Sequence, residues 1–249
     1  MKWRDEGFLI AKRDYGESDV ILEVFTKDHG LWRGLVRGGA SRRRRAEFQI
    51  GAQLVVTWTA RLANQLGGFR AEASEMRAGR LFDDPCALAA LGSLSALIRQ
   101  GFAQGDAHQG FYQCTVELLD CLRDRDKWPA VYALWELKYL ESLGFCLDLD
   151  RCAATGVAQE LNWVSPRTGR AVSSIAAAPY EDRLLPLPGF LRLGDPFGDP
   201  FGNPFATSQD VCAALLITGT FLEKWVAPAI GIDELPEQRS RLCALLCRA

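Results

Sequence analysis

The chain has 249 residues, 48% of them hydrophobic, so two domains with a real apolar core are expected. A net charge of −2 argues, taken alone, against a nucleic-acid partner. The average conceals an asymmetry, because residues 1–80 hold 15 Lys or Arg against 10 Asp or Glu, whereas residues 81–249 hold 14 against 21. This split indicates a nucleic-acid-facing N-terminal part joined to something else.

The N-terminus argues against export. Asp5 and Glu6 stand where a signal peptide would have its apolar core, and no apolar run approaches the ~20 residues of a membrane span. A cytoplasmic location is therefore expected, with nucleoid association if the source is bacterial. In that compartment the eight cysteines should be reduced thiols, and without any CxxC pair a disulfide framework is not expected.

The first 80 residues read as five short strands, expected at 6–12, 20–26, 31–37, 53–61 and 69–75. Glycine-containing turns separate them, and no helix of convincing length intervenes. In the fourth strand, Trp58 and its alternate neighbours form one face and the residues between them the other. This pattern predicts a small closed barrel such as an OB-fold, which frequently binds single strands.

Between the third and fourth strands, Gly38-Gly39-Ala40-Ser41 is followed by four consecutive arginines, Arg42, Arg43, Arg44 and Arg45. Four adjacent guanidiniums repel one another, and neither a strand nor a helix would place them all on one buried surface. We therefore expect a mobile loop that rises from a strand end. Such a loop suits phosphates, but a solvated loop without a partner explains the run equally well.

The periodicity changes near Asp84, a suitable N-cap, and Pro85, a suitable first helical residue. Helices are expected at 86–102, 109–123 and from 127 to Gly144, then at 209–226 with Ser208 as the cap, and at 235–247. Residues 81–249 are thus predicted to form an all-α domain. The fold class is α+β with two domains, 1–80 and 81–249.

An irregular insertion, 145–206, interrupts the predicted helices. Its end, 195–205, repeats the tetrapeptide Asp-Pro-Phe-Gly nearly three times, and this density of proline and glycine excludes a helix. The exposed phenylalanines either dock on the surface of their own domain or bind a partner.

No catalytic constellation is recognisable. The two histidines, His29 and His108, form no pattern with a cysteine or serine nucleophile. Asp148 and Asp150 could hold Mg²⁺, but the further carboxylates of a nuclease site cannot be placed. We therefore predict a protein that is not an enzyme and has no cofactor.

Several motifs resemble the RecO family of recombination mediators. In the N-terminal part they are Glu6-Gly7-Phe8-Leu9-Ile10, Tyr15-Gly16-Glu17-Ser18-Asp19, Val24-Phe25-Thr26-Lys27-Asp28-His29-Gly30 and Val36-Arg37-Gly38-Gly39. In the second part they are Leu140-Glu141-Ser142-Leu143-Gly144-Phe145, Leu147-Asp148-Leu149-Asp150 and Ser165-Pro166-Arg167-Thr168-Gly169-Arg170-Ala171-Val172. Their order and spacing across most of the chain carry the resemblance.

The resemblance implies an OB-fold domain and a helical domain that bind single- and double-stranded DNA and anneal complementary strands. It also implies that the protein, together with RecR, helps load RecA onto strands coated by single-stranded-DNA-binding protein. The helical domain of the family receives the acidic, apolar C-terminal tail of that coating protein. An RNA-binding OB-fold protein and a protein-interaction adaptor remain as alternatives.

The candidate site residues follow from this interpretation. For phosphate contact we predict Arg33, Arg37, Arg42, Arg43, Arg44, Arg45 and Arg61. Base stacking could use Trp32, Trp58 or Phe69, although alternation favours a core position for Trp58. One or two of Arg99, Arg123, Arg125 and Lys127 are predicted to flank the groove for the partner's tail.

The chain departs from the family at a zinc site. Many relatives carry four zinc-binding cysteines after the segment that corresponds to Leu147-Asp148-Leu149-Asp150. This chain keeps Cys152 but has Thr155 at the second position and Ser173 and Ser174 where the other pair would be. Cys146 and Cys152 alone cannot supply four zinc ligands, so a degenerate zinc-ribbon-like insertion without metal is expected.

Overall fold

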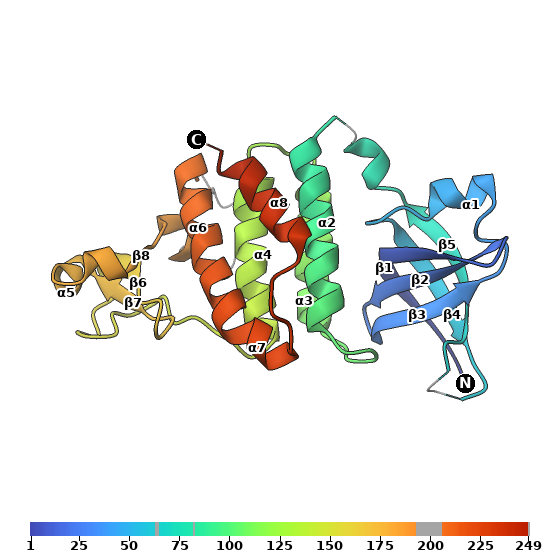
Figure 1. Ribbon diagram of the computed structural model, residues 1–249, viewed down its shortest axis with the longest axis horizontal. Coiled ribbons are helices and arrows are strands. Elements are labelled where there is room, and N and C mark those ends of the chain that lie inside the picture. The colour runs from blue at the N-terminus through green and yellow to red at the C-terminus, as the bar shows by residue number, and fades with distance from the viewer. Residues whose placement is uncertain (63–64, 82, 193–205, 249) are drawn as a thin grey trace. The chain divides into compact units, whose positions relative to one another are not determined.

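The computed structural model describes residues 1–62, 65–81, 83–192 and 206–248 (Figure 1). The chain divides into two compact units, Met1–Arg123 and Asp124–Ala249. The first contains a five-stranded sheet and three α-helices, and the second is mainly helical. The predicted domain boundary at 80/81 lies inside the first unit, so two of the predicted helices group with the sheet.

All five predicted strands are confirmed: β1 (Lys2–Tyr15), β2 (Asp19–Thr26), β3 (Gly30–Val36), β4 (Gln53–Thr59) and β5 (Gly68–Glu75). β1 begins four residues earlier than expected. The pairs are antiparallel except β3–β5, which are parallel and joined at one residue pair, Leu35 with Gly68. Because β4 pairs with both β5 and β1, the order β1-β2-β3-β5-β4 closes on itself.

The inside of the closed sheet is an apolar core, as the alternation in β4 predicts. Leu54, Val56 and Trp58 are at most 1% exposed, and Phe69 of β5 packs with them. Trp58 is therefore a core residue, as alternation favours. The expectation that Trp58 or Phe69 stacks on bases is wrong, because a buried ring offers no face to a ligand.

The arginine run forms a short helix, α1 (Arg42–Glu47), so the expectation of a mobile loop is wrong. None of its residues is buried, and a helix solvated on all sides does not need a single apolar face. Glu47 lies one turn after Arg43 and within 3.4 Å of its guanidinium, which supports the helix. The sequence analysis rejected a helix because a helix could not place all four arginines on one buried surface, but none of these side chains is buried.

Two helices, α2 (Pro85–Gly101) and α3 (Gln109–Cys121), belong to the first unit. Asp84 caps α2 as predicted, because its carboxylate accepts the Ala87 backbone N–H at 3.0 Å. The loop between the helices packs closely on the β2–β3 turn. A Cβ added to Gly30, which has φ +67°, would lie 1.9 Å from the Asp106 carbonyl oxygen. Only glycine fits this contact.

A polar chain also ties α3 to the sheet. Gln53 Nε2 donates to the Tyr112 hydroxyl at 2.8 Å, and Gln53 Oε1 accepts from Arg77 at 3.1 Å. The Arg77 side chain is 5% exposed, and its Nε donates to Asp120 of α3 at 2.8 Å. Burial raises the pKa of Tyr112 to about 12, so its hydroxyl keeps its proton. The sheet and α3 therefore share one buried hydrogen-bond network.

The second unit is built on α4 (Trp128–Ser142), α6 (Ser208–Phe221) and α8 (Glu237–Leu246), with a π-helical turn η4 (Leu222–Val226) and α7 (Ala227–Ile230) extending α6. The cap of α6 is Thr207 and not Ser208, since Thr207 and Asp210 form a reciprocal capping box. Inside the unit, the fully buried Glu136 accepts two 2.8 Å bonds from Arg239, which fastens α8 to α4.

The insertion is more regular than expected. β6 (Leu161–Val164), β7 (Ala171–Ser173) and β8 (Leu185–Pro186) form a sheet in the order β7-β6-β8, with α5 (Ser174–Ala177) after β7. Short antiparallel pairs of three and two residues give a weak periodicity, which explains why the strands were not predicted. The predicted Asp-Pro-Phe-Gly loop at 195–205 lies outside the described residues.

The expectation that all eight cysteines are reduced thiols is wrong, and one long helix bears on the expectation of no membrane span. Cys212 of α6 and Cys247 after α8 form a disulfide, because folding brings their Cα atoms to 5.6 Å across 35 residues of sequence. The continuous helix Ser208–Ile230 is also long and apolar enough to cross a membrane, by length and composition alone. Its most apolar window is 56% buried inside the protein, as in the core helix of a soluble protein.

Candidate nucleic-acid interface

The arginines of α1 carry more positive charge than their neighbours neutralise. Arg43 and Arg44 both approach the Glu47 carboxylate, at 3.4 and 3.9 Å, and Arg45 lies 4.0 Å from Asp14. Arg42 is also exposed. The side chains of Arg43 and Arg45 are 91% and 61% exposed, and ion pairs in that setting contribute at most about 1 kcal/mol. These guanidiniums can therefore exchange their carboxylates for phosphates at little cost.

Arg44 differs from its neighbours because it connects α1 to the sheet. Its Nη1 donates to the Ala71 carbonyl of β5 at 2.8 Å, and its guanidinium lies 5.5 Å from the centre of the Phe48 ring. The side chain is 36% exposed. In an antiparallel pair, the N–H and C=O of one strand residue point to the same side. The Ala71 carbonyl accepts from Arg44, so the backbone groups of Ala71 point toward α1 and not toward β4. Arg44 thus has a structural role in addition to its charge.

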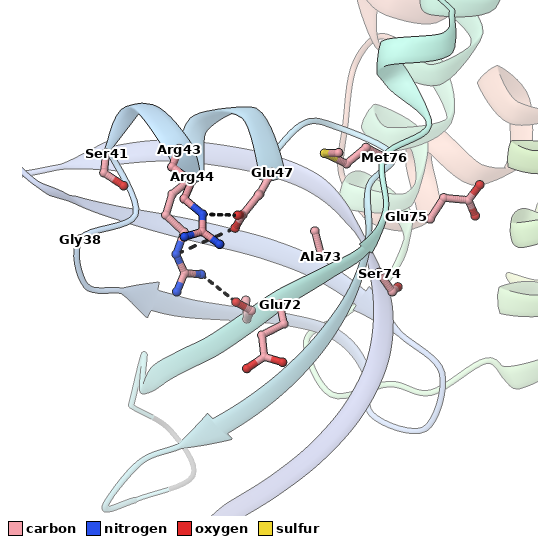
Figure 2. Close-up of a pocket in the computed structure, with 11 residues that line it drawn as sticks. Gly38, Ser41, Arg43, Arg44, Glu47, Glu72, Ala73, Ser74, Glu75 and Met76 are labelled. Atoms are coloured by element: carbon pink, nitrogen blue, oxygen red, sulfur yellow. Dashed lines mark hydrogen bonds and ion pairs between the residues drawn. The ribbon is translucent and has the colours of Figure 1, made fainter.

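A groove of about 660 Å³ separates α1 from β5, and we call it the α1–β5 groove (Figure 2). Arg43, Arg44 and Glu47 line one wall, and the stretch of β5 from Ala71 onward lines the other. Figure 2 shows both arginines directed toward Glu47 and Arg44 reaching toward β5. Glu72 and Glu75 also line the groove, so its charge is mixed.

A second cavity, of about 700 Å³, lies where β3 meets β5, and we call it the β3–β5 cavity. Lys2, Arg37, Arg44 and Arg70 line it, and among the described lining residues none is acidic. Neither Lys2 nor Arg70 is among the predicted site residues. Lys2 was missed because β1 starts earlier than expected. Alternation in β5 identifies Arg70 as outward-facing, because its neighbours Phe69 and Ala71 point into the core.

The remaining predicted arginines lie elsewhere on the first unit. Arg33 is exposed on β3, and Arg61 is exposed just after β4, and neither lines the groove or the cavity. Trp32 is half-buried, with its ring centre 5.5 Å from that of Trp3 and 4.7 Å from that of Trp58. The structure therefore brings Arg37 and Arg44 together in the β3–β5 cavity, but it does not add Arg33, Arg61 or Trp32 to them.

The four cations predicted to flank a partner groove do not form one site. Arg99 donates to Glu23 at 2.8 and 3.1 Å, and Arg123 lies 3.3 Å from Glu75, both within the first unit. Lys127 lies 3.6 Å from Asp124 in the second unit, where Arg125 is exposed. Arg99, Arg123 and Lys127 therefore each have an acidic neighbour already. Their role in binding a partner stays a prediction.

The second unit contains a groove of about 270 Å³, which we call the α4 groove, and its lining includes the acids Glu141 and Asp150. Lys138 is the cation in its lining. The leucines that line it come from α4, from the start of the insertion and from near its end: Leu134, Leu137, Leu147, Leu149 and Leu191. Glu141 pairs with Lys138 at 3.0 Å. None of the four predicted flanking cations lines this groove.

The residues at the family's zinc position do not fit that metal. The Cys152 sulfur is buried and accepts the Ser173 backbone N–H at 3.3 Å and its hydroxyl at 3.4 Å. One thiol among hydroxyls is not the set of four sulfur or imidazole ligands that structural zinc requires. Burial opposes ionisation of this thiol, but the hydrogen bonds from Ser173 and Thr155 outweigh it and lower the pKa of Cys152 to about 6.

Comparison with known proteins gave consistent matches along the chain. The family profiles "Recombination protein O N terminal" and "Recombination protein O C terminal" match residues 1–76 and 83–229. The DNA repair protein RecO of Ruegeria sp. (strain TM1040) is 46% identical over 248 residues, covering 100% of this chain and 99% of that protein. The RecO of Hyphomonas neptunium (strain ATCC 15444) is 46% identical over 244 residues, covering 97% of each.

Proposed function

Because this chain belongs to the RecO family of DNA repair proteins, we propose that it binds and anneals single-stranded DNA as a recombination mediator. The family consists of repair mediators and not of enzymes. In this role the chain acts with RecR and helps load RecA, which it reaches indirectly, onto strands coated by single-stranded-DNA-binding protein. A repair function fits a cytoplasmic location, and DNA binding would associate the protein with the nucleoid.

The observation that carries this proposal is the clustering of cations on the first unit. Arg37, which follows β3, and Arg44 of α1 line a cavity to which β1 and β5 add Lys2 and Arg70, and α1 carries three further arginines that are exposed. Lys2 and Arg70 are 68 residues apart in sequence, and the closed sheet brings them to one cavity. Concentrated positive charge of this kind releases counterions when it binds a phosphate backbone.

The architecture supports the same function. We interpret the closed five-stranded sheet, with α1 between β3 and β4, as an OB-fold, a frequent binder of single strands. We interpret the small β7-β6-β8 sheet as a degenerate zinc ribbon that folds without zinc. Phosphate contacts hold a strand without reading its sequence, as annealing of arbitrary complementary strands requires.

Annealing by the full-length protein tests the proposal. Two complementary oligonucleotides, each coated with single-stranded-DNA-binding protein, should form duplex faster with wild-type protein than without it. The triple variant Arg42→Ala, Arg43→Ala, Arg45→Ala should lose most of this acceleration at moderate salt. Tight binding of structured RNA with no annealing of DNA would favour an RNA-binding protein. Binding of protein partners with no affinity for either nucleic acid would favour an adaptor.

The α4 groove is the surface that we propose for the acidic, apolar tail of single-stranded-DNA-binding protein. Its leucines suit the apolar end of such a tail, and Lys138 suits a carboxylate. Leu137→Asp in the full chain should therefore abolish binding of the tail peptide. Leu216→Asp is the matched control, because Leu216 is 54% exposed on α6 and lies outside the groove. Equal loss in both variants would contradict this assignment.

A further inference from the structure

The outward face of three strands carries an ordered block of positive charge. Trp58 points into the core, so its neighbours Thr57 and Thr59 point outward. The strand register places Lys2 beside Thr59, and Thr59 beside Gly68. The next row contains Arg4, Thr57 and Arg70. Three cations and two hydroxyls therefore share one face of β1, β4 and β5.

This basic block has a sharp boundary. The third row along the same face contains Glu6, Val55 and Glu72, with an acid on each outer strand. The β3–β5 cavity opens beside the two basic rows, where Arg37 and Arg44 add two cations. Arg70 has one acidic neighbour, Glu72, at 3.4 Å, but the two side chains are 82% and 68% exposed. Such a pair contributes at most about 1 kcal/mol and gives way easily to a phosphate.

The shape of the cavity favours a flexible ligand. Its volume of about 700 Å³ lies in the range of pockets that enclose small ligands. Beside it, the Leu35 N–H of β3 donates to the carbonyl of Gly67, the residue before β5, at 3.1 Å. A single strand can bend one or two phosphates into this space. A duplex resists bending on so short a length scale.

We propose that the β3–β5 cavity is a phosphate-binding site selective for single-stranded nucleic acid, in which Lys2, Arg37 and Arg70 hold consecutive phosphates and Thr57 and Thr59 donate hydroxyl hydrogen bonds. This site rests on the proposed function and adds strand selectivity to it. The exposed arginines of α1 contact single strands and duplexes alike, whereas the cavity accepts only the former.

The test compares two double variants of the full chain. Lys2→Ala with Arg70→Ala removes two cavity cations, and Lys12→Ala with Arg13→Ala removes one lysine and one arginine that are exposed on β1 but do not line the cavity. Affinity for a labelled homothymidine strand and for a duplex of equal length is measured by fluorescence anisotropy across a salt series. Thermal unfolding checks that both variants are folded, as their exposed positions predict.

We expect the cavity variant to lower the salt slope for the single strand by about 1.4, at roughly 0.7 per phosphate, and to leave duplex binding unchanged. The control variant should affect both ligands little. Equal losses for single strand and duplex, or an unchanged single-strand slope, would overturn the cavity site while leaving DNA binding intact. The same loss for inorganic tripolyphosphate as for the strand would reveal an unselective anion site and also overturn it. Wild-type protein that binds neither nucleic acid would overturn both this inference and the proposed function.

Discussion

Of the four arginines of α1, only Arg44 should also support the fold, and single and triple variants can distinguish it from the other three. Arg44→Ala removes the 2.8 Å bond to the Ala71 carbonyl and the contact with the Phe48 ring. A hydrogen bond from a charged group contributes about 1.5–3 kcal/mol. Because the Arg44 side chain is 36% exposed, water replaces part of it, and we expect a loss of about 1 kcal/mol. In a chain of this size that corresponds to a Tm lower by roughly 2–4 °C.

The triple variant Arg42→Ala, Arg43→Ala, Arg45→Ala should behave in the opposite way. Its exposed side chains should each change the free energy of unfolding by less than about 0.5 kcal/mol. If two of them contact phosphates, the slope of log affinity against log salt for a single strand becomes shallower by about 1.4. Urea unfolding and anisotropy over a salt series measure the two effects. An Arg44→Ala variant as stable as wild type, or a triple variant that is unfolded, would refute this division of roles.

Four other predictions concern the scaffold and the insertion. Gly30→Ala should destabilise the protein by at least about 2 kcal/mol, more than the control Gly16→Ala, because both glycines have positive φ but only Gly30 touches another backbone; equal urea midpoints would contradict this. A fragment of residues 1–123 should fold cooperatively while one of 1–80 should not, since the latter exposes the sheet surface that α2 and α3 cover; far-UV circular dichroism decides. Purified protein should hold far less than one zinc per chain by elemental analysis. The stability of the protein should fall as the pH drops from 9 through about 6, because the pKa of Cys152 is lowered on folding. A Cys152→Ser variant with the same dependence of stability on pH would contradict the role of the thiolate.

Local patterns predicted the elements well. Alternation around Trp58 predicts β4, and Asp84 with Pro85 predicts the start of α2, because each signal lies within a few residues of the element it determines. The arginine helix was missed for a different reason. A helix was rejected there because it could not bury all four arginines, although a short solvated helix does not require burial.

The contacts that build the candidate site come from distant parts of the sequence. Lys2 and Arg70 meet only because β4 pairs with both β1 and β5, and that register is a property of the closed sheet. The disulfide of Cys212 with Cys247 depends in the same way on how α6 packs against α8. The grouping of α3 with the sheet depends on the buried Arg77, which donates to both Gln53 and Asp120. Periodicity carries no information on such pairings.

The central claim, that the first unit is a single-stranded-DNA-binding surface, is tested most directly by comparing three ligands at one salt concentration. Full-length protein is titrated into a single-stranded DNA, a duplex of the same length and a structured RNA, each carrying the same label. The cation cluster on the sheet and α1 predicts that the single strand binds most tightly and the duplex measurably less. Preference for the structured RNA, or equally weak binding of all three, would contradict the account.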